Sequence, residues 1–328
     1  MAVYVNTNYS ALQGQRYLGN VQNSLTTTYQ RLSSGMRINS AKDDAAGLQI
    51  ADRLTSQING LNQGNRNASD GIALAQTMEA GMDEISGMLQ KVRTLTVQAA
   101  NGTNTSADRA ALSKEVSSLL TEVNRIATQT TFAGKTVLNG QSADESSLFG
   151  KAAADGGKAG VGGPNGTMTL QVGSNKGDTI SFTAESVMFS KIGAGHGKFG
   201  QMVAEQAGKI FKTDKDNGAV TVTFTKANFA NAAADDYIGN VIELMDTAIS
   251  KIDGMRADLG AIQNRLESSI RNQSNVAANE ADARSRIRDA DFAEESANLS
   301  QQSIIQQAAA SMLMQANTRP QLGLSLLG

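Results

Sequence analysis

The stretch LTSQINGLNQGNRNASDGIALAQTMEAGMDEISGMLQKVRTL, residues 54–95, determines the fold. Its apolar side chains recur at steps of three and four, which places them along one stripe of an α-helix. The members are Leu54, Ile58, Leu61, Ala68, Ile72, Ala75, Met82, Ile85, Leu89, Val92 and Leu95, with Asn65 as a polar member. The heptad spacing slips near Met82, as at a stutter. We therefore predict a long helix that packs along one side.

Shorter stripes lie on both sides of this one. The stripe before it consists of Leu18, Val21, Leu25 and Leu32, and Ser33-Ser34-Gly35 breaks it. After a turn at Asn101-Gly102, Ser106 or Asp108 is a candidate cap for a helix that ends before Phe132. A further stripe runs from Ile238 to Ile270. The last one contains Leu299, Ile305, Ala308, Met312 and Ala316, and we expect Pro320 to end it.

Residues 141–234 differ from the rest of the chain. They hold seven of the nine Phe and 15 of the 32 Gly. Apolar residues alternate with polar ones around two turns, which predicts two hairpins, with Met168, Leu170, Val172, Ile180 and Phe182 in the first and Val220, Val222 and Phe224 in the second. The run from Gly156 to Gly166 is typical of a surface loop. The fold class we expect is mainly α, with long antiparallel helical coiled-coil arms from both termini and a small β-rich central insert.

Composition excludes several functional classes. The net charge is −2, so the protein has no overall positive electrostatic field that would attract nucleic acid or an acidic membrane surface. No stretch reaches about 18 apolar residues, and the first residues do not resemble a Sec-type signal peptide. The chain has no Cys, which excludes disulfides and Cys-ligated metal sites. We expect neither a nucleic-acid partner nor a membrane partner.

Motifs of catalysis are weak. Gly195–Gly200 matches G-x-G-x-x-G, and Asp214 or Asp216 follows at a suitable distance, but the flanking residues alternate as in hairpins and give no parallel βαβ unit. His196 is the only histidine, so no histidine pair is available for a metal or a nucleophile. We expect no catalytic, cofactor-binding or metal-binding residues. An enzyme carried in the insert is therefore the hypothesis that these motifs support least.

The terminal stripes suggest assembly. Their helices are otherwise covered in Gln, Asn, Ser and Thr, so they are marginal as isolated helices in water. Each can bury its stripe against the other terminus or against copies of the same chain. Periodicity alone does not separate a polymer from a closed helical bundle.

Three segments resemble the signature sequences of bacterial flagellins. They are LSSGMRINSAKDDAAGLQI at 32–50, SRIRDADF at 285–292 with the following residues to Leu299, and QANTRPQ at 315–321. The similarity extends over about residues 1–140 and 235–328. It implies a subunit of a hollow helical filament for swimming motility, located in the extracellular bacterial flagellum.

The resemblance also implies a domain organisation. Residues 1–43 with 286–328 correspond to an inner-core coiled-coil domain, and residues 44–140 with 235–285 to an outer-core helical domain. The insert, residues 141–234, corresponds to a variable surface domain. The implied partners are further copies of the chain, the flagellar type III export apparatus and an export chaperone, the filament cap and hook-junction proteins, and the host Toll-like receptor 5.

Three groups of residues become candidates for these interactions. We expect filament assembly to involve Leu18, Val21, Leu25, Leu32, Ile305, Ala308, Met312 and Leu313. We expect the connection between inner and outer domains to involve Gly35, Lys42, Asp43, Asp44, Arg286 and Asp289. By resemblance, an innate-receptor contact comprises Lys91, Arg93, Leu95, Gln98 and Glu115. The alternative to a filament subunit is a hook–filament junction or cap-like protein that assembles in only a few copies.

Overall fold

The computed structural model describes residues 8–140, 146–149, 165–189, 211–213, 220–224 and 238–327. The chain divides into two compact units. The terminal unit comprises Met1–Gly60 and Asn275–Gly328, and the central unit comprises Leu61–Ser274. Two long helices, α2 (Ala45–Ala99) and α5 (Ile238–Arg288), contribute residues to both units. The predicted fold class, helical arms from both termini with a small strand-containing central region, is confirmed.

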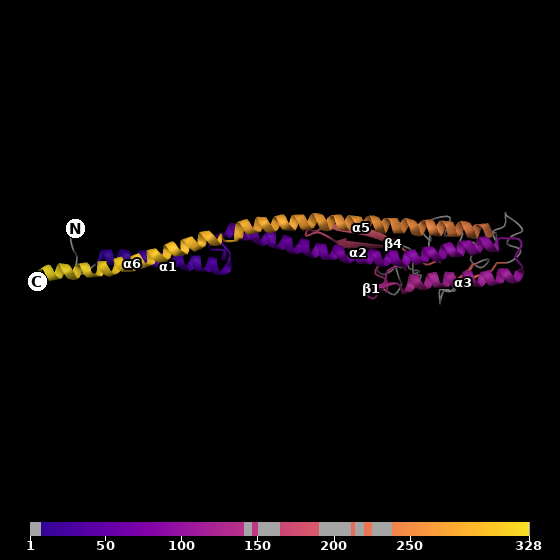
Figure 1. Cartoon of the computed structure of the whole chain (residues 1–328), viewed down its shortest axis with the longest axis horizontal. Helices are drawn as coiled ribbons and strands as arrows, with labels where there is room; N and C mark the ends of the chain where they lie inside the picture. The colour runs from indigo at the N-terminus through magenta and orange to yellow at the C-terminus, as the bar shows by residue number, and fades with distance from the viewer. Residues whose placement is uncertain are drawn as a thin grey trace, which may run out of the picture. The chain divides into compact units, whose positions relative to one another are not determined.

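The terminal unit is built on two helices from opposite ends of the chain, α1 (Tyr9–Ser34) and α6 (Phe292–Leu327), which lie side by side (Figure 1). Asn8 caps α1 by accepting a hydrogen bond from the Ala11 N–H at 3.1 Å. Its Nδ2 also donates to the Ala316 carbonyl at 2.8 Å, and the Gly35 carbonyl accepts from Ala290 N–H at 3.0 Å. These two links show that the helices run antiparallel.

Of the two helix ends that the sequence predicts here, one is confirmed and the other is wrong. Helix α1 ends where the sequence indicates, because Gly35 adopts a left-handed conformation with φ of 68° that few other residues tolerate. The prediction that Pro320 ends the last helix is wrong, since α6 continues to Leu327. Proline removes one backbone donor but keeps a helical φ, so a helix can continue past it at some cost in stability.

In the central unit, α2 packs against α5 on one side and against α3 (Ser106–Gln129) on another. Cross-helix contacts include Gln263 Nε2 to Glu79 Oε2 at 3.0 Å and Arg256 to Asp83 at 3.0 Å. The start of α3 is capped by Thr105, not by Ser106 or Asp108 as predicted. Thr105 Oγ1 accepts from the Asp108 N–H, and the Asp108 carboxylate accepts from the Thr105 N–H, which together form a capping box.

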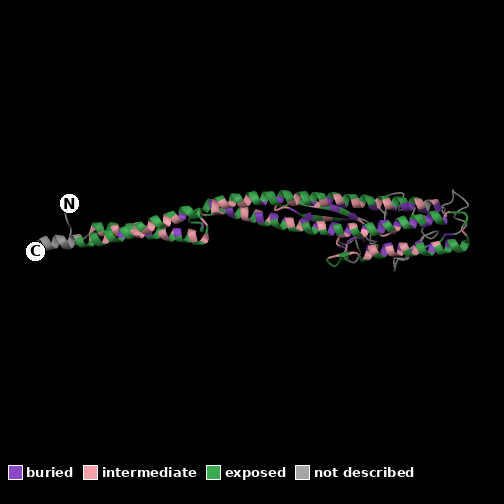
Figure 2. Ribbon diagram, in the orientation of Figure 1, coloured by how far each residue is buried: buried purple, intermediate pink, exposed green. Residues whose placement is uncertain are grey.

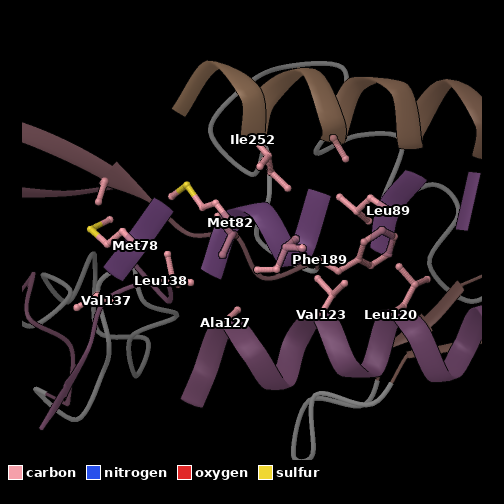
Figure 3. Close-up of a cluster of buried hydrophobic side chains, with 14 of the residues drawn as sticks. Met78, Met82, Leu89, Leu120, Val123, Ala127, Val137, Leu138, Phe189 and Ile252 are labelled. Atoms are coloured by element: carbon pink, nitrogen blue, oxygen red, sulfur yellow. The ribbon is translucent and has the colours of Figure 1, made fainter. Parts of the chain in front are cut away.

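The buried face of α2 in the central unit follows a heptad repeat without a slip. From Leu61 to Ala99 one row of buried positions alternates between steps of three and four: Leu61, Gly64, Ala68, Gly71, Ala75, Met78, Met82, Ile85, Leu89, Val92, Thr96 and Ala99. Leu74, Ser86 and Leu95 are buried beside this row. The stutter predicted near Met82 is therefore wrong. It arose because two members of the row are glycines and carry no apolar side chain. Around Met82, side chains of α2, α3 and α5 interdigitate with Leu138 and Phe189 (Figure 3).

Three short antiparallel sheets complete the central unit. A tight turn with positive φ at Ala133 and Gly134 joins β1 (Thr131–Phe132) to β2 (Lys135–Thr136). Strand β3 (Asn165–Gln171) pairs with β4 (Thr179–Glu185), and β5 (Phe211–Thr213) pairs with β6 (Val220–Val222). The two predicted hairpins are confirmed as strand pairs. The turn at Asn217-Gly218 and most of the run from Gly156 lie outside the described residues.

Glycines of α2 let the insert approach the helix closely. A Cβ added at Gly64 would lie 2.0 Å from the Val172 carbonyl oxygen, and one at Gly71 would lie 2.4 Å from Leu170 Cδ1. Asn67, between the two glycines, donates from its Nδ2 to the Gln171 carbonyl at 2.8 Å. The β3–β4 hairpin is thus seated on α2, and its buried side chains join the helical core.

A row of hydroxyl groups on α3 receives the strand β6. Val220 N–H donates to Thr121 Oγ1 at 3.2 Å, and Val222 N–H donates to Ser117 Oγ at 2.8 Å. Phe224 N–H donates to Ser113 Oγ at 3.0 Å. We call Ser113, Ser117 and Thr121 the hydroxyl row. Backbone donors that a sheet would pair with carbonyls are here satisfied by helix side chains.

Candidate functional site

The contact between α1 and α6 is a heptad seam on both helices. On α1 the covered positions are Ala11, Gly14, Leu18, Val21, Leu25, Thr28 and Leu32. On α6 they are Glu295, Leu299, Gln302, Gln306, Ala309, Leu313 and Ala316. Thr28 Oγ1 lies 3.3 Å from Gln302 Oε1, and Leu313 Cδ1 packs 3.2 Å from where a Gly14 Cβ would stand. The α6 side of this seam is therefore largely small or polar.

Exposed positions run along α1 and α6 (Figure 2), and they include several bulky apolar side chains that lie outside the seam. Among the described residues, ten of the eleven large apolar side chains that are exposed belong to the terminal unit, and Val97 alone to the central unit. The ten are Tyr9, Leu12, Tyr17, Tyr29, Ile50, Val276, Phe292, Ile304, Met312 and Met314. A soluble protein rarely gathers so much exposed apolar surface on one part without using it.

The predicted assembly residues fall into two groups in the structure. Val21 is buried in the seam, and Leu18, Leu25, Leu32 and Leu313 are half-buried at seam positions. Ile305 is half-buried beside the seam. Ala308 is exposed, as is Met312, which lines a groove with Gly14, Tyr17 and Ala309. The stripe predicted on α6 differs from the observed seam. Gln302 and Gln306 occupy seam positions, and a search for apolar residues does not find them.

A second site is the connection where the chain leaves α1 and enters α2, residues 35–44. Backbone groups join this segment to the link between α5 and α6: Arg37 N–H donates to the Arg288 carbonyl at 2.7 Å, and Met36 pairs with Asp289 in a short antiparallel bridge. The Arg37 guanidinium also donates to the Ile287 carbonyl at 2.8 Å. The two polypeptide strands are thus held together at one point by backbone bonds.

Two aspartates shape the connection. Asp43 accepts hydrogen bonds from Ser40 N–H at 2.9 Å, from Ser40 Oγ at 3.0 Å and from Asn39 N–H at 3.2 Å. These donors, the Ser40 N–H foremost, hold the pKa of Asp43 below its ordinary value. Asp44 accepts from Gly47 N–H at 2.9 Å at the start of α2. A Cβ at Gly47 would lie 2.4 Å from Asp44 Oδ2, so glycine is needed there for close approach, not for a turn.

The other predicted connection residues act more locally. Arg286 pairs with Asp282 one turn away on α5 at 2.9 Å, and Asp289 accepts from Ser285 Oγ at 2.7 Å. Lys42 is exposed. The cross-links that sequence reasoning missed are those of Arg37 and the ion pair of Arg31 with Glu295 at 3.1 Å. Both join residues about 250 or more positions apart in the chain, so no local sequence pattern indicates them.

The third predicted group lies on α2 and α3 in the central unit. Lys91 pairs with Glu115 of α3 at 3.0 Å, and Arg93 makes a two-pronged contact with Asp246 of α5. The Asp246 carboxylate raises the pKa of Arg93 above its ordinary value. Gln98 is exposed, whereas Leu95 is buried in the core. Four of the five residues are therefore exposed, with Lys91 and Glu115 paired between α2 and α3 and Arg93 paired with α5.

No cluster of His, Cys, Asp or Glu suited to a metal ion occurs among the residues that the structure describes. Within the same residues, no helix is both long and apolar enough to cross a membrane. His196, the Gly195–Gly200 motif, Asp214 and Asp216 lie outside the described residues.

Comparison with known sequences matches both ends of the chain. A family model described as the bacterial flagellin N-terminal helical region matches residues 5–143, and one described as the bacterial flagellin C-terminal helical region matches residues 242–327. Flagellin B of Vibrio cholerae is 36% identical, polar flagellin F of Vibrio parahaemolyticus 37% and flagellin B of Vibrio anguillarum 38%, each over the whole of both chains.

Among solved structures, a protein described as flagellar hook-associated, from Vibrio parahaemolyticus, aligns with a TM-score of 0.52. The alignment covers 75% of this chain and 100% of that one at 15% identity. At this identity the likeness concerns the fold alone.

Proposed function

Because the chain belongs to the bacterial flagellin family, we propose that the outward faces of α1 and α6 are the surfaces through which its copies join. The chain is a structural subunit of the flagellar filament and not an enzyme. Filaments of this family self-assemble, are extracellular, and serve swimming motility. What has to be explained is which residues of this chain make the polymer.

The single observation that carries the proposal is the concentration of exposed apolar side chains on the terminal unit. In a closed bundle these side chains would fill the contact between α1 and α6. Here that contact contains Gln302, Gln306 and Glu295, while Ile304, Met312 and Tyr17 remain exposed. Burying an Ile or Met side chain contributes about 1.5–3 kcal/mol, so contact with a second copy is strongly favoured over exposure.

We assign the predicted assembly residues two roles. Leu18, Val21, Leu25, Leu32 and Leu313 hold α1 against α6, and Ile305 borders this contact. Ala308 and Met312 face a neighbouring copy directly. The neutral Gln, Asn, Ser and Thr side chains around them can form hydrogen bonds between copies without the desolvation cost of buried charges.

The domain organisation remains part of the proposal. Residues 1–43 with 286–328 form the inner core, residues 44–140 with 235–285 the outer core, and residues 141–234 the surface domain. Gly35, Lys42, Asp43, Asp44, Arg286 and Asp289 belong to the connection between inner and outer core. The backbone bonds of Arg37 and Ala290 support this role, because they fix the chain where the two cores meet in sequence.

The terminal helices are also the surfaces that we assign to partners other than further copies of the chain. Before assembly, the apolar face of α6 requires a cover, and an export chaperone that binds this helix ahead of the type III export apparatus would supply one. Secretion by that route, and contacts with the filament cap and hook-junction proteins through the terminal helices, complete the proposal.

An innate-receptor contact at Lys91, Arg93, Gln98 and Glu115 is the remaining partner proposal, with Toll-like receptor 5 as the receptor. The exposed side chains of this group support it. Leu95 is 9% exposed, so we assign it a supporting place in the helix core and not a direct contact.

The decisive experiment is seeded elongation. Purified chain is added to filament fragments, and length is followed by electron microscopy. Indefinite growth supports a filament subunit, whereas arrest after one layer would favour the junction-protein alternative. Removal of residues 1–30 or 300–328 should abolish growth while the circular dichroism of the central unit persists. Normal filaments from either truncation would overturn the proposed assembly surface.

A further inference from the structure

The described methionines differ sharply in exposure. Met312 and Met314 of α6 are 70% and 67% exposed. The other described methionines are buried or half-buried: Met36, Met78, Met82, Met88, Met168, Met188, Met245 and Met255. The chain has no cysteine, so thioethers are its only sulfur groups. Within the described residues, accessible sulfur is therefore concentrated on one turn of α6.

The stretch of α6 around these two residues is uncharged, because no Asp, Glu, Lys or Arg occurs between Glu295 and Arg319. On the facing helix α1, Arg16 precedes Tyr17. Met312 lines the groove that Gly14, Tyr17 and Ala309 also line. Association through such a surface depends largely on apolar burial and neutral hydrogen bonds, and a strong new dipole in it would find no charged group on this stretch of α6 to compensate it.

We propose that Met312 and Met314 are an oxidation site that controls subunit addition, an inference that rests on the assembly surface proposed above. The reagent is a two-electron oxidant such as hydrogen peroxide. The thioether sulfur attacks one peroxide oxygen, an S–O bond forms as the O–O bond breaks, and the departing hydroxide takes up the remaining proton as water. The sulfur loses two electrons, and the product is methionine sulfoxide.

The sulfoxide is polar and cannot enter an apolar contact without loss. Burying an unpartnered polar group weakens subunit addition, so each sulfoxide raises the critical concentration for growth about tenfold. A filament that buries Met312 and Met314 also shields their sulfur atoms from the oxidant. Oxidation in filaments is therefore slower than in free subunits.

The test treats free subunits and preformed filaments of the full chain with hydrogen peroxide. Mass spectrometry maps the sulfoxides, and light scattering gives the critical concentration before and after oxidation. The double variant Met312→Leu/Met314→Leu keeps apolar bulk without sulfur. Met88→Leu/Met255→Leu, which removes two half-buried methionines of the central unit, is the matched control. For each protein the measured quantity is the ratio of oxidised to unoxidised critical concentration.

We expect a ratio of about tenfold or more for the wild type and the control, and a ratio near one for the α6 double variant. Methionine sulfoxide reductase should restore growth of the oxidised wild type in step with the loss of the sulfoxides mapped at Met312 and Met314, which tests the site even if the α6 variant assembles poorly. Slow oxidation in filaments combined with a wild-type ratio near one would overturn the switch and leave the assembly surface intact. Equal oxidation rates in filaments and free subunits would contradict the assembly surface itself.

Discussion

Arg31 Nη1 of α1 lies 3.1 Å from Glu295 Oε1 of α6, and the Glu295 side chain is nine-tenths buried. This pair stands at the end of the seam next to the connection. Since α6 begins at Phe292, the carboxylate also lies in the first helical turn, where the helix dipole favours negative charge. The pair therefore joins the last turn of α1 to the first turn of α6.

Replacing Glu295 with alanine should weaken filament growth. A hydrogen bond to a charged group is worth about 1.5–3 kcal/mol, and the substitution leaves the Arg31 guanidinium half-buried without its partner. We expect the critical concentration to rise about tenfold or more. Glu294→Ala, at the exposed neighbouring position in the same turn, is the control, and an equal effect of both variants would rule out a special role for Glu295.

Exposed Ile304 tests the outward face. Ile304→Ser should leave the unfolding free energy within about 0.5 kcal/mol, because the side chain is exposed in the free subunit. The loss of burial against a neighbouring copy should raise the critical concentration about tenfold or more. Val97→Ser, the exposed apolar position of the central unit, should change neither quantity appreciably. Unaltered growth of Ile304→Ser would argue that this face remains in solvent.

The connection should respond to acid through Asp43. The pKa of Asp43 in the fold is below its ordinary value of 3.8, so its ionised form stabilises the fold. That stabilisation is fully present above pH 3.8 and is lost as the pH falls through the lowered pKa. A carboxyl ¹³C titration of Asp43 should show a midpoint below 3.8. In Asp43→Asn the Ser40 amide should exchange faster at neutral pH, and an unchanged rate would mean that the Asp43 bonds do not order this turn.

The β3–β4 hairpin should need a glycine at the position of α2 that it contacts most closely. Gly64→Ala places a Cβ 2.0 Å from the Val172 carbonyl oxygen, so the β3–β4 hairpin must shift, at a cost of about 1–3 kcal/mol in unfolding free energy. Gly87, on the same helix, has nothing within 4 Å of its added Cβ. Gly87→Ala should instead stabilise the protein by up to about 1 kcal/mol through helix propensity. Denaturant unfolding of both variants measures the contrast, and similar values would contradict the seating of the hairpin.

The hydroxyl row should be detectable by a single oxygen deletion. Ser117→Ala leaves the Val222 N–H without its acceptor and should lower the unfolding free energy by about 1 kcal/mol relative to Ser118→Ala. Ser118 is exposed, and its hydroxyl bonds only to the Lys114 carbonyl in its own helix. Hydrogen exchange should show reduced protection of the Val222 amide in Ser117→Ala alone.

Much of the helical architecture was predictable because apolar periodicity reports burial directly. Leu18, Val21, Leu25 and Leu32 were placed correctly on the seam of α1, and Gly35 on the break after it. The pattern failed where buried positions are not apolar. Because Gly64 and Gly71 have no apolar side chain, the heptad repeat of α2 was wrongly predicted to slip. Because Gln302 and Gln306 are polar, the buried face of α6 was predicted at other positions.

The candidate site was predictable in part. The resemblance indicated Asp43 and Asp44 for the connection, and both accept backbone hydrogen bonds that order its turns. The bonds of Arg37 with the α5–α6 link depend on segments about 250 residues apart, which local patterns do not bring together. The insert strands were predicted, but their seating on glycines and hydroxyls of the helices was not.

The hydroxyl row sets a limit on how far a strand can follow a helix. Four helical residues advance about 6.0 Å, whereas two strand residues advance about 6.6 Å, so the two repeats fall out of step by about 0.6 Å at each contact. The three described contacts span 2.8 to 3.2 Å. Each further contact in the same register would add a similar offset, so a strand that continued along the helix would have to bend to keep its amides bonded.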